Sequence, residues 1–161
     1  MKYALVGLTL AAMAATPVLA QNAAQIDSAR GGANCPHCNL FQADLGSKEL
    51  KGKNFAGARL RQADLSLSVM NRTNFGGTDM RDVNAYGAVF SSANFSGADL
   101  THASFVGTYL QGANFAGAKL IGTNFSGAEM DKARGLSQSQ LNAACGDAST
   151  TLPSGMRLRS C

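Results

Sequence analysis

The apolar residues of the chain recur every five positions through its middle. Nineteen positions at this spacing, from Leu40 to Met130, are all apolar, and all except Ala85 are Leu, Phe or Met. A period of five fits neither the 3.6-residue repeat of a helix nor the two-residue alternation of a strand. The pattern therefore predicts a solenoid, in which short repeats pack on one another and the recurring residues form a continuous core.

Reading these positions every 20 residues separates them into four columns, and one column contains only phenylalanine. An Asn directly precedes each Phe of this column, and a Gly lies two positions after it. If four repeats form one coil, residues 20 apart stack about 4.8 Å above one another, which is one strand spacing. We therefore predict 20-residue coils with ladders of Phe rings and Asn side chains along one side. The ladders contain Phe55, Phe75, Phe95 and Phe115, and Asn54, Asn74, Asn94 and Asn114.

Small and polar residues occupy fixed places before the recurring apolar residue. Ala, Ser, Thr or Cys stands two positions before it in 16 of 19 repeats, and Asn or Asp directly before it in 11 of 19. The motif, clear in Ala93-Asn94-Phe95, resembles the pentapeptide-repeat family over residues 38–132. This resemblance implies an all-β solenoid, a right-handed quadrilateral β-helix of nearly five coils. It also implies that the apolar and the small residue point inward while the other three face solvent.

Two early repeats depart from the motif, because Lys48 and Lys53 stand where small inward residues belong. Burying an unpaired ammonium group is unfavourable. We therefore expect a loosened first coil in which both ammonium groups reach solvent. Farther along, bulky Val83 precedes the undersized Ala85, which indicates a local compensation of volume.

The ends of the chain lie outside the repeat. Residues 1–20 have the pattern of a secretory signal peptide, with a basic start, an apolar run and a small-residue cleavage site. We therefore expect an exported protein, periplasmic or extracellular, with no transmembrane segment after cleavage. Residues 21–34 are expected to form a flexible linker, residues 35–132 the β-helix and residues 133–161 a C-terminal cap. In that cap, Ser137 and Gln140 form a capping-box pattern that predicts a short helix over about residues 138–145.

Four cysteines form two pairs in the sequence, Cys35 with Cys38 and Cys145 with Cys161. Export to an oxidising compartment favours a structural disulfide at each end of the solenoid. The Cys35-Pro36-His37-Cys38 motif also matches the active site of oxidising thiol oxidoreductases, which leaves a thiol-disulfide redox function as the alternative. No βαβ pattern surrounds this motif, and Cys38 already occupies an inward position of the repeat.

Composition narrows the remaining function classes. The formal net charge is +4, or +3 once Lys2 is removed, which fits neither a polyanionic DNA mimic nor a strongly cationic nucleic-acid binder. Nucleic-acid binding, and the topoisomerase inhibition by DNA mimicry that the family resemblance implies, therefore rank behind other functions. His37 and His102 fall in separate coils, and Asp79 and Asp82 lie among arginines on an outer surface. The sequence thus contains no catalytic constellation and predicts no cofactor or metal site.

One outward surface is apolar where the repeat usually presents polar residues. Three residues directly before the third column and three at the adjoining corner should form one patch bounded by charge. Such patches mark interfaces, although β-branched and aromatic residues also suit a flat strand surface. We therefore predict a non-enzymatic scaffold or binding module that contacts an unknown protein partner, or a second copy of itself, through this patch. Its residues are Leu67, Val69, Tyr86, Val89, Val106 and Tyr109.

Overall fold

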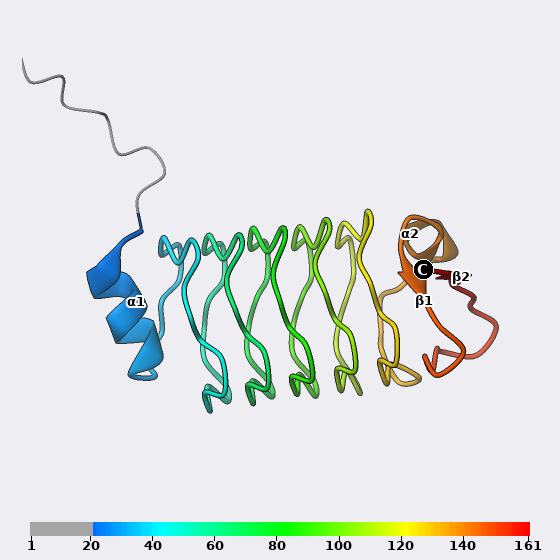
Figure 1. Ribbon diagram of the computed structural model, residues 1–161, viewed down its shortest axis with the longest axis horizontal. Coiled ribbons are helices and arrows are strands. Elements are labelled where there is room, and N and C mark those ends of the chain that lie inside the picture. The colour runs from blue at the N-terminus through cyan, green and yellow to red at the C-terminus, as the bar shows by residue number, and fades with distance from the viewer. Residues whose placement is uncertain (1–20) are drawn as a thin grey trace, which may run out of the picture.

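The computed structural model describes residues 21–161, so the predicted signal peptide at 1–20 lies outside the described residues. The chain forms an elongated tube of stacked coils with a helix at each end (Figure 1). Helix α1 (Ala23–Arg30) covers the N-terminal end, and helix α2 (Gln138–Asn142) lies at the C-terminal end with strands β1 (Cys145–Gly146) and β2 (Arg159–Ser160). None of the helices in this part of the chain is long and apolar enough to cross a membrane.

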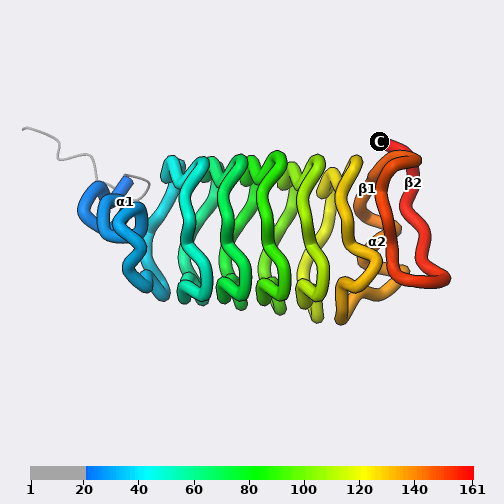
Figure 2. The backbone as a smooth tube through the Cα atoms, turned by 90° about the horizontal axis from the view of Figure 1, so that it is seen from below, coloured from blue at the N-terminus to red at the C-terminus, as the bar shows by residue number. Residues whose placement is uncertain are grey.

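Each coil pairs with the next through single parallel bridges between residues 20 apart, such as Asn74 with Asn94 and Val89 with Tyr109. Two-residue turns separate successive bridges, which divides each 20-residue coil into four short sides with corners between them. Figure 2 shows these coils following one another along the tube. The spacing is the one that the Phe and Asn columns of the sequence predicted.

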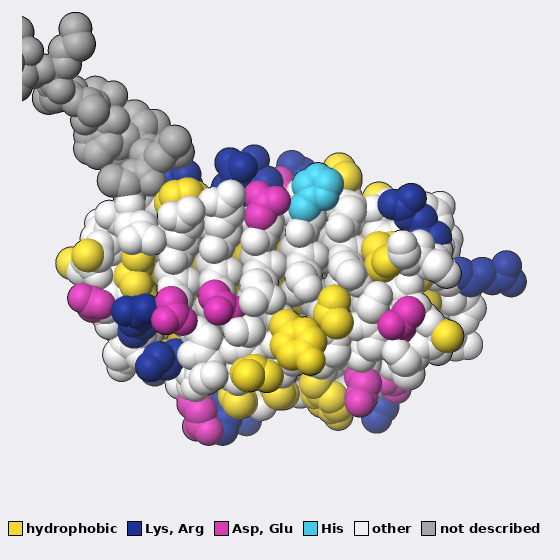
Figure 3. All heavy atoms as spheres, viewed as in Figure 1, with side chains coloured by type: hydrophobic (Ala, Val, Ile, Leu, Met, Phe, Trp, Pro, Cys, Tyr) yellow, Lys and Arg dark blue, Asp and Glu magenta, His cyan; other side chains and the backbone are white. Residues whose placement is uncertain are grey.

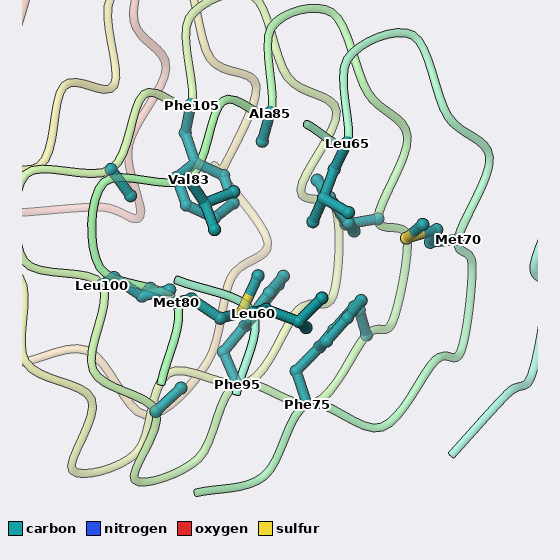
Figure 4. Close-up of a cluster of buried hydrophobic side chains, with 14 of the residues drawn as sticks. Leu60, Leu65, Met70, Phe75, Met80, Val83, Ala85, Phe95, Leu100 and Phe105 are labelled. Atoms are coloured by element: carbon teal, nitrogen blue, oxygen red, sulfur yellow. The ribbon is translucent and has the colours of Figure 1, made fainter. Parts of the chain in front are cut away.

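The recurring apolar residues fill the interior of the tube. All 19 residues at the five-residue spacing are buried, including Ala85. The ring of Phe95 stacks on those of Phe75 and Phe115, with ring centroids 5.2 Å apart in both cases. Val83 is buried in the same part of the core as Ala85 (Figure 4). A close-packed interior of this kind fixes the positions of the outward side chains.

The Asn column forms a hydrogen-bonded ladder outside the Phe column. The Nδ2 of Asn94 donates to the Oδ1 of Asn74 at 2.9 Å, and the Nδ2 of Asn114 donates to the Oδ1 of Asn94 at 3.2 Å. The Oδ1 of Asn94 also accepts the backbone N–H of Ser96 at 3.1 Å. Each Asn thus satisfies a corner N–H and joins two coils, which explains the strict recurrence of this residue.

The segment 21–34 is not the flexible linker that the sequence predicted. It contains α1, whose Ile26 and Ala29 are buried in the hydrophobic core cluster. Arg30, at the last turn of α1, donates from Nε to the backbone oxygen of Asp44 at 2.7 Å. The helix is held there because the first coil has no coil before it, and the open end of its core needs apolar cover.

The two lysines at inward positions are accommodated without a break in the coil. Lys48 is exposed, and Lys53 is half-buried with the end of its side chain close to Gly32. The expected loosening of the coil does not occur, since the backbone oxygen of Lys48 accepts the N–H of Val69 at 2.8 Å. Lys48 therefore reaches solvent, and Lys53 extends toward the segment that precedes the first coil.

The C-terminal helix begins with a capping box, in which Ser137 and Gln140 exchange hydrogen bonds between side chain and backbone. Helix α2 spans Gln138–Asn142 and is shorter than the predicted 138–145, because the chain then enters β1 and bridges to the last coil. The Nε2 of Gln140 also donates to two backbone oxygens of the coil beneath it, at 2.9 Å each. Strand β1 pairs in parallel with β2, which closes this end of the tube.

Candidate functional site: an apolar face of the tube

One half of the predicted patch is a column on a single side of the tube. Val69 bridges to Val89, and Val89 bridges to Tyr109, so the three residues stack over successive coils. The small residue before each of them is buried, which turns these three side chains outward. Val69 and Val89 are half-buried by their neighbours, whereas Tyr109 is 39% exposed.

The adjoining corner supplies the other half. Leu67 and Tyr86 are 59% and 55% exposed, and Val106 is half-buried. The N–H of Leu67 donates to the backbone oxygen of Tyr86 at 2.8 Å, and Gly87 donates to Val106 at 2.9 Å, so the corners stack in register. A Cβ on Gly87, which has a φ of +63°, would lie 2.9 Å from the Cδ2 of Leu67. Because glycine has no Cβ, this position leaves room for the Leu67 side chain to pack against it.

These two halves form a continuous surface, which we call the apolar face. In Figure 3 it lies in the lower central part of the tube, where hydrophobic side chains gather. The apolar face consists of Leu67, Val69, Tyr86, Val89, Val106 and Tyr109.

Charged residues bound the apolar face at both ends. Glu49 bridges to the first member of the column and Glu129 to the last. The Nζ of Lys51 lies 3.5 Å from a carboxylate oxygen of Glu49. The corner on the far side of the column is polar and contains Asn71, Arg72, Ser91, Ser92 and Gln111. The apolar face is therefore asymmetric, with an apolar corner on one flank and a polar corner on the other.

Asp79 and Asp82, which the sequence placed among arginines, each have an arginine as partner. Arg81 donates from Nε and Nη2 to both carboxylate oxygens of Asp79, at 2.7 Å each. These hydrogen bonds hold the pKa of Asp79 below its ordinary value. Asp82 lies 3.4 Å from the Nε of Arg61. Asp99 stacks on Asp79 through a parallel bridge. It accepts a hydrogen bond from the Thr101 hydroxyl at 2.6 Å and lies 3.6 Å from the Nζ of Lys119. The arrangement is an outer surface on which each of these carboxylates has a cationic partner.

Both cysteine pairs are disulfides, joining Cys35 to Cys38 and Cys145 to Cys161, as the sequence predicted. Cys35 is buried and Cys38 is half-buried, in a turn whose backbone bonds to the first coil. The His37 ring lies over Gly57, where an added Cβ would meet Nδ1 at 2.5 Å. Helix α1 ends at Arg30, before this motif. The pair therefore lacks the helix N-terminus that lowers the pKa of the reactive thiol in oxidoreductases.

Other surface features offer less. Within residues 21–161, no group of three His, Cys, Asp or Glu side chains is placed to hold a metal ion. An open cleft of about 330 Å³ lies between α1 and the first coil. Its lining includes Arg30, whose Nη2 lies 3.1 Å from Asp44 and whose Nη1 lies 4.0 Å from Asp27. The five-residue pattern predicts neither this cleft nor α1, which forms one of its walls. Ile121, which is not among the residues predicted for the patch, is 55% exposed at a different corner.

Comparison with known protein families matches eight copies of pentapeptide repeats, over residues 49–84, 68–107, 98–134 and 108–144. No curated protein sequence gave a match. Among solved structures, a pentapeptide repeat protein from the thylakoid lumen of Arabidopsis thaliana is 27% identical, over 50% of this chain and 67% of its own, with a TM-score of 0.38. Rfr23 from the cyanobacterium Cyanothece 51142 is 21% identical, over 80% and 97% of the two chains, with a TM-score of 0.36. HetL from Nostoc sp. strain PCC 7120, a protein involved in heterocyst differentiation regulation, is 21% identical, over 81% and 63%, with a TM-score of 0.33.

Proposed function

Since the chain belongs to the pentapeptide-repeat family, whose repeats build right-handed β-helix solenoids, we propose that it is a non-enzymatic module that binds another protein through the apolar face. One observation carries this proposal. Of the four large hydrophobic side chains that are exposed in the described part of the chain, Leu67, Tyr86 and Tyr109 belong to this face. Aromatic and aliphatic side chains clustered in this way are typical of interface cores. Tyr also contributes a hydroxyl that can bond to a partner at the edge of the contact.

The tube suits a scaffold role because its backbone is held on both sides of the face. Val89 is bridged to the coil before it and to the coil after it, and its inward neighbour Phe90 is fully buried. A surface fixed in advance loses little conformational freedom when it binds. The family match indicates no catalytic family.

The module would act outside the cytoplasm, in the periplasm or the extracellular medium. Residues 1–20 carry the signal-peptide pattern, and two disulfides lie at opposite ends of the tube. Disulfides persist in oxidising compartments, so both features support export. The test is cell fractionation followed by intact mass. Export predicts a periplasmic or secreted protein that lacks about its first 20 residues and has no free thiol. A full-length, reduced protein in the cytoplasm would contradict it.

The binding role is tested by capture from extracts of the same compartment. The bait is the protein with both disulfides, compared with a Val89→Lys/Tyr109→Lys variant and with Ile121→Lys. The last substitution is the matched control, since it also places a charge on an exposed apolar residue, but at a different corner. We expect the double variant to lose captured proteins and the control to retain them. Equal capture by all three forms would contradict a role for the apolar face.

A further inference from the structure

We propose that the partner of the apolar face is a second copy of this chain, packed antiparallel about a two-fold axis. The inference rests on the proposed function and adds the identity and the orientation of the partner. In a two-fold dimer the same surface meets itself, so the surface must be complementary to its own rotated copy. The flanking corners of the apolar face, together with Lys51 and Asp131 at its two ends, favour one orientation.

The corners decide between two arrangements. If the two-fold axis runs along the tubes, the chains are parallel and each corner meets the opposite corner of its partner. Leu67 and Tyr86 would then lie against the polar corner that contains Arg72. If the axis runs across the tubes, the chains are antiparallel and the apolar corner meets the apolar corner. The antiparallel arrangement therefore buries the whole apolar face against apolar atoms and leaves the exposed Arg72 outside its core.

The stacking of the face sets the register of the antiparallel pair. Its central coil carries Tyr86 and Val89, and the coils on either side carry Val69 and Tyr109. An axis through the central coil brings Tyr86 onto the partner's Tyr86 and Val89 onto the partner's Val89. The same axis brings Val69 onto the partner's Tyr109, which pairs the smaller side chain with the larger one.

The two ends of this side of the tube carry opposite net charge. At the N-terminal end, Lys48, Glu49 and Lys51 sum to +1, and at the other end Glu129, Asp131 and Lys132 sum to −1. All six side chains are exposed. The antiparallel register places the basic end opposite the partner's acidic end. Lys51 then faces the partner's Asp131, while Glu49 faces the partner's Glu129, so the favourable charge contact is that of Lys51. A parallel pair would bring like ends together. Opposite charges at the rim of a contact favour one orientation over another.

The size of the face indicates a dimer that depends on concentration. Six residues form its apolar part. Standard stable interfaces use about 20–30 residues on each side. We therefore expect a dissociation constant in the range from roughly tens of micromolar to 1 mM, which corresponds to weak association.

The orientation is tested by placing a thiol on the axis. In a Tyr86→Cys variant of the protein with its two native disulfides, the two new thiols lie close together only in the antiparallel register. We expect a covalent dimer on a non-reducing gel after mild oxidation. Gln62→Cys is the matched control, since Gln62 is an exposed corner residue on another part of the tube, and it should remain monomeric. Absence of a covalent dimer, or equal crosslinking of both variants, would overturn the proposed orientation.

The charge pairing is tested by sedimentation of the purified protein over a series of concentrations. Lys51→Asp and Asp131→Lys should each weaken dimerisation by about three-fold or more, and the double swap should restore it, because the charges again oppose each other. Val89→Lys should abolish it. Circular dichroism verifies that each variant is folded. A double swap no stronger than the single variants would contradict the register.

The two proposals fail in distinguishable ways. If the purified protein stays monomeric up to about 1 mM while Val89→Lys/Tyr109→Lys still abolishes capture of other proteins, the dimer is wrong and the binding role stands. If neither dimerisation nor capture responds to these substitutions, both proposals are wrong.

Discussion

Two neighbouring sides of the tube share the same backbone geometry and differ in what their outward side chains do. On the side of Phe95, the outward residue is Asn94, which bonds to the Asn residues above and below it. On the side of Phe90, the outward residue is Val89, which bridges through its backbone alone and lies in the apolar face. Both inward Phe residues are fully buried. The inward residue therefore stabilises the coil on both sides. The outward residue either links neighbouring coils, as Asn94 does, or is available to contact a partner, as Val89 is.

The largest expected effect separates inward from outward residues. Replacing Phe95 by Ala removes a ring that contacts Phe75 and Phe115 and should lower the free energy of unfolding by about 3–5 kcal/mol. Val89→Ala should lower it by only about 1 kcal/mol or less, because its side chain lies at the surface. Denaturant unfolding measures both. Similar losses for the two variants would break the distinction between the inward and the outward position.

The next effect compares the disulfides at the two ends of the tube. The Cys145–Cys161 disulfide ties the tail across the last coil, with a sequence separation of 16 residues. Replacing both cysteines by Ser should lower the free energy of unfolding by about 3 kcal/mol in the chain-entropy model. The Cys35–Cys38 disulfide closes a separation of only three residues, so its removal should have a smaller effect. A larger loss from the N-terminal pair would show that the ends of the tube depend on something other than loop closure.

A smaller effect compares the two outward columns directly. Asn94→Ala leaves the Nδ2 of Asn114 and the backbone N–H of Ser96 without an acceptor. We expect a loss of about 1–3 kcal/mol in thermal or denaturant unfolding, with no change in dimerisation or capture. Val89→Lys should give the opposite result, with small loss of stability and full loss of association. If Asn94→Ala abolished association instead, the Asn column would also belong to the binding surface.

The smallest effect concerns the outer ion pairs. Arg81 lowers the pKa of Asp79 in the folded protein, so the folded state favours the charged carboxylate. The resulting stability is present above the unfolded pKa of about 3.9 and is lost as pH falls through the lower folded pKa. Asp79→Asn should therefore make the melting temperature fall less on acidification than it does in the unmodified protein. The difference should correspond to less than about 1 kcal/mol, since the pair is partly exposed. A variant that keeps the full acid sensitivity would show that other carboxylates dominate.

The coil and its core can be predicted from the sequence because every repeat has the same types of residue at its inward positions. Reading Phe55 to Phe115 at intervals of 20 residues gives the stacking of one side without any knowledge of the ends. Helix α1 could not be found in this way. Only Ile26 and Ala29 of its eight residues are buried, so its amphipathic pattern is too short to recognise. Its position depends on a tertiary requirement, the uncovered end of the first coil.

The residues of the candidate site could be predicted from the sequence, but the packing of their side chains could not. The outward positions of the repeat placed Val89 and Tyr109 in one column, and the fourfold coil placed Leu67 at the next corner. The packing of Leu67 over Gly87 depends on side-chain direction at a left-handed corner, which no spacing rule supplies. The pairing of Arg81 with Asp79 likewise depends on how one turn orients two side chains.

The two lysines of the first coil have a consequence for growth of the tube itself. A solenoid of identical coils offers unpaired backbone groups at each end, and a second tube could extend it there into a fibre. Lys48 is exposed and Lys53 half-buried at this end, both at positions that the later repeats fill with small residues. An approaching tube would have to bury these ammonium groups, which is unfavourable without a partner. Together with α1, they disfavour the addition of a second tube at this end.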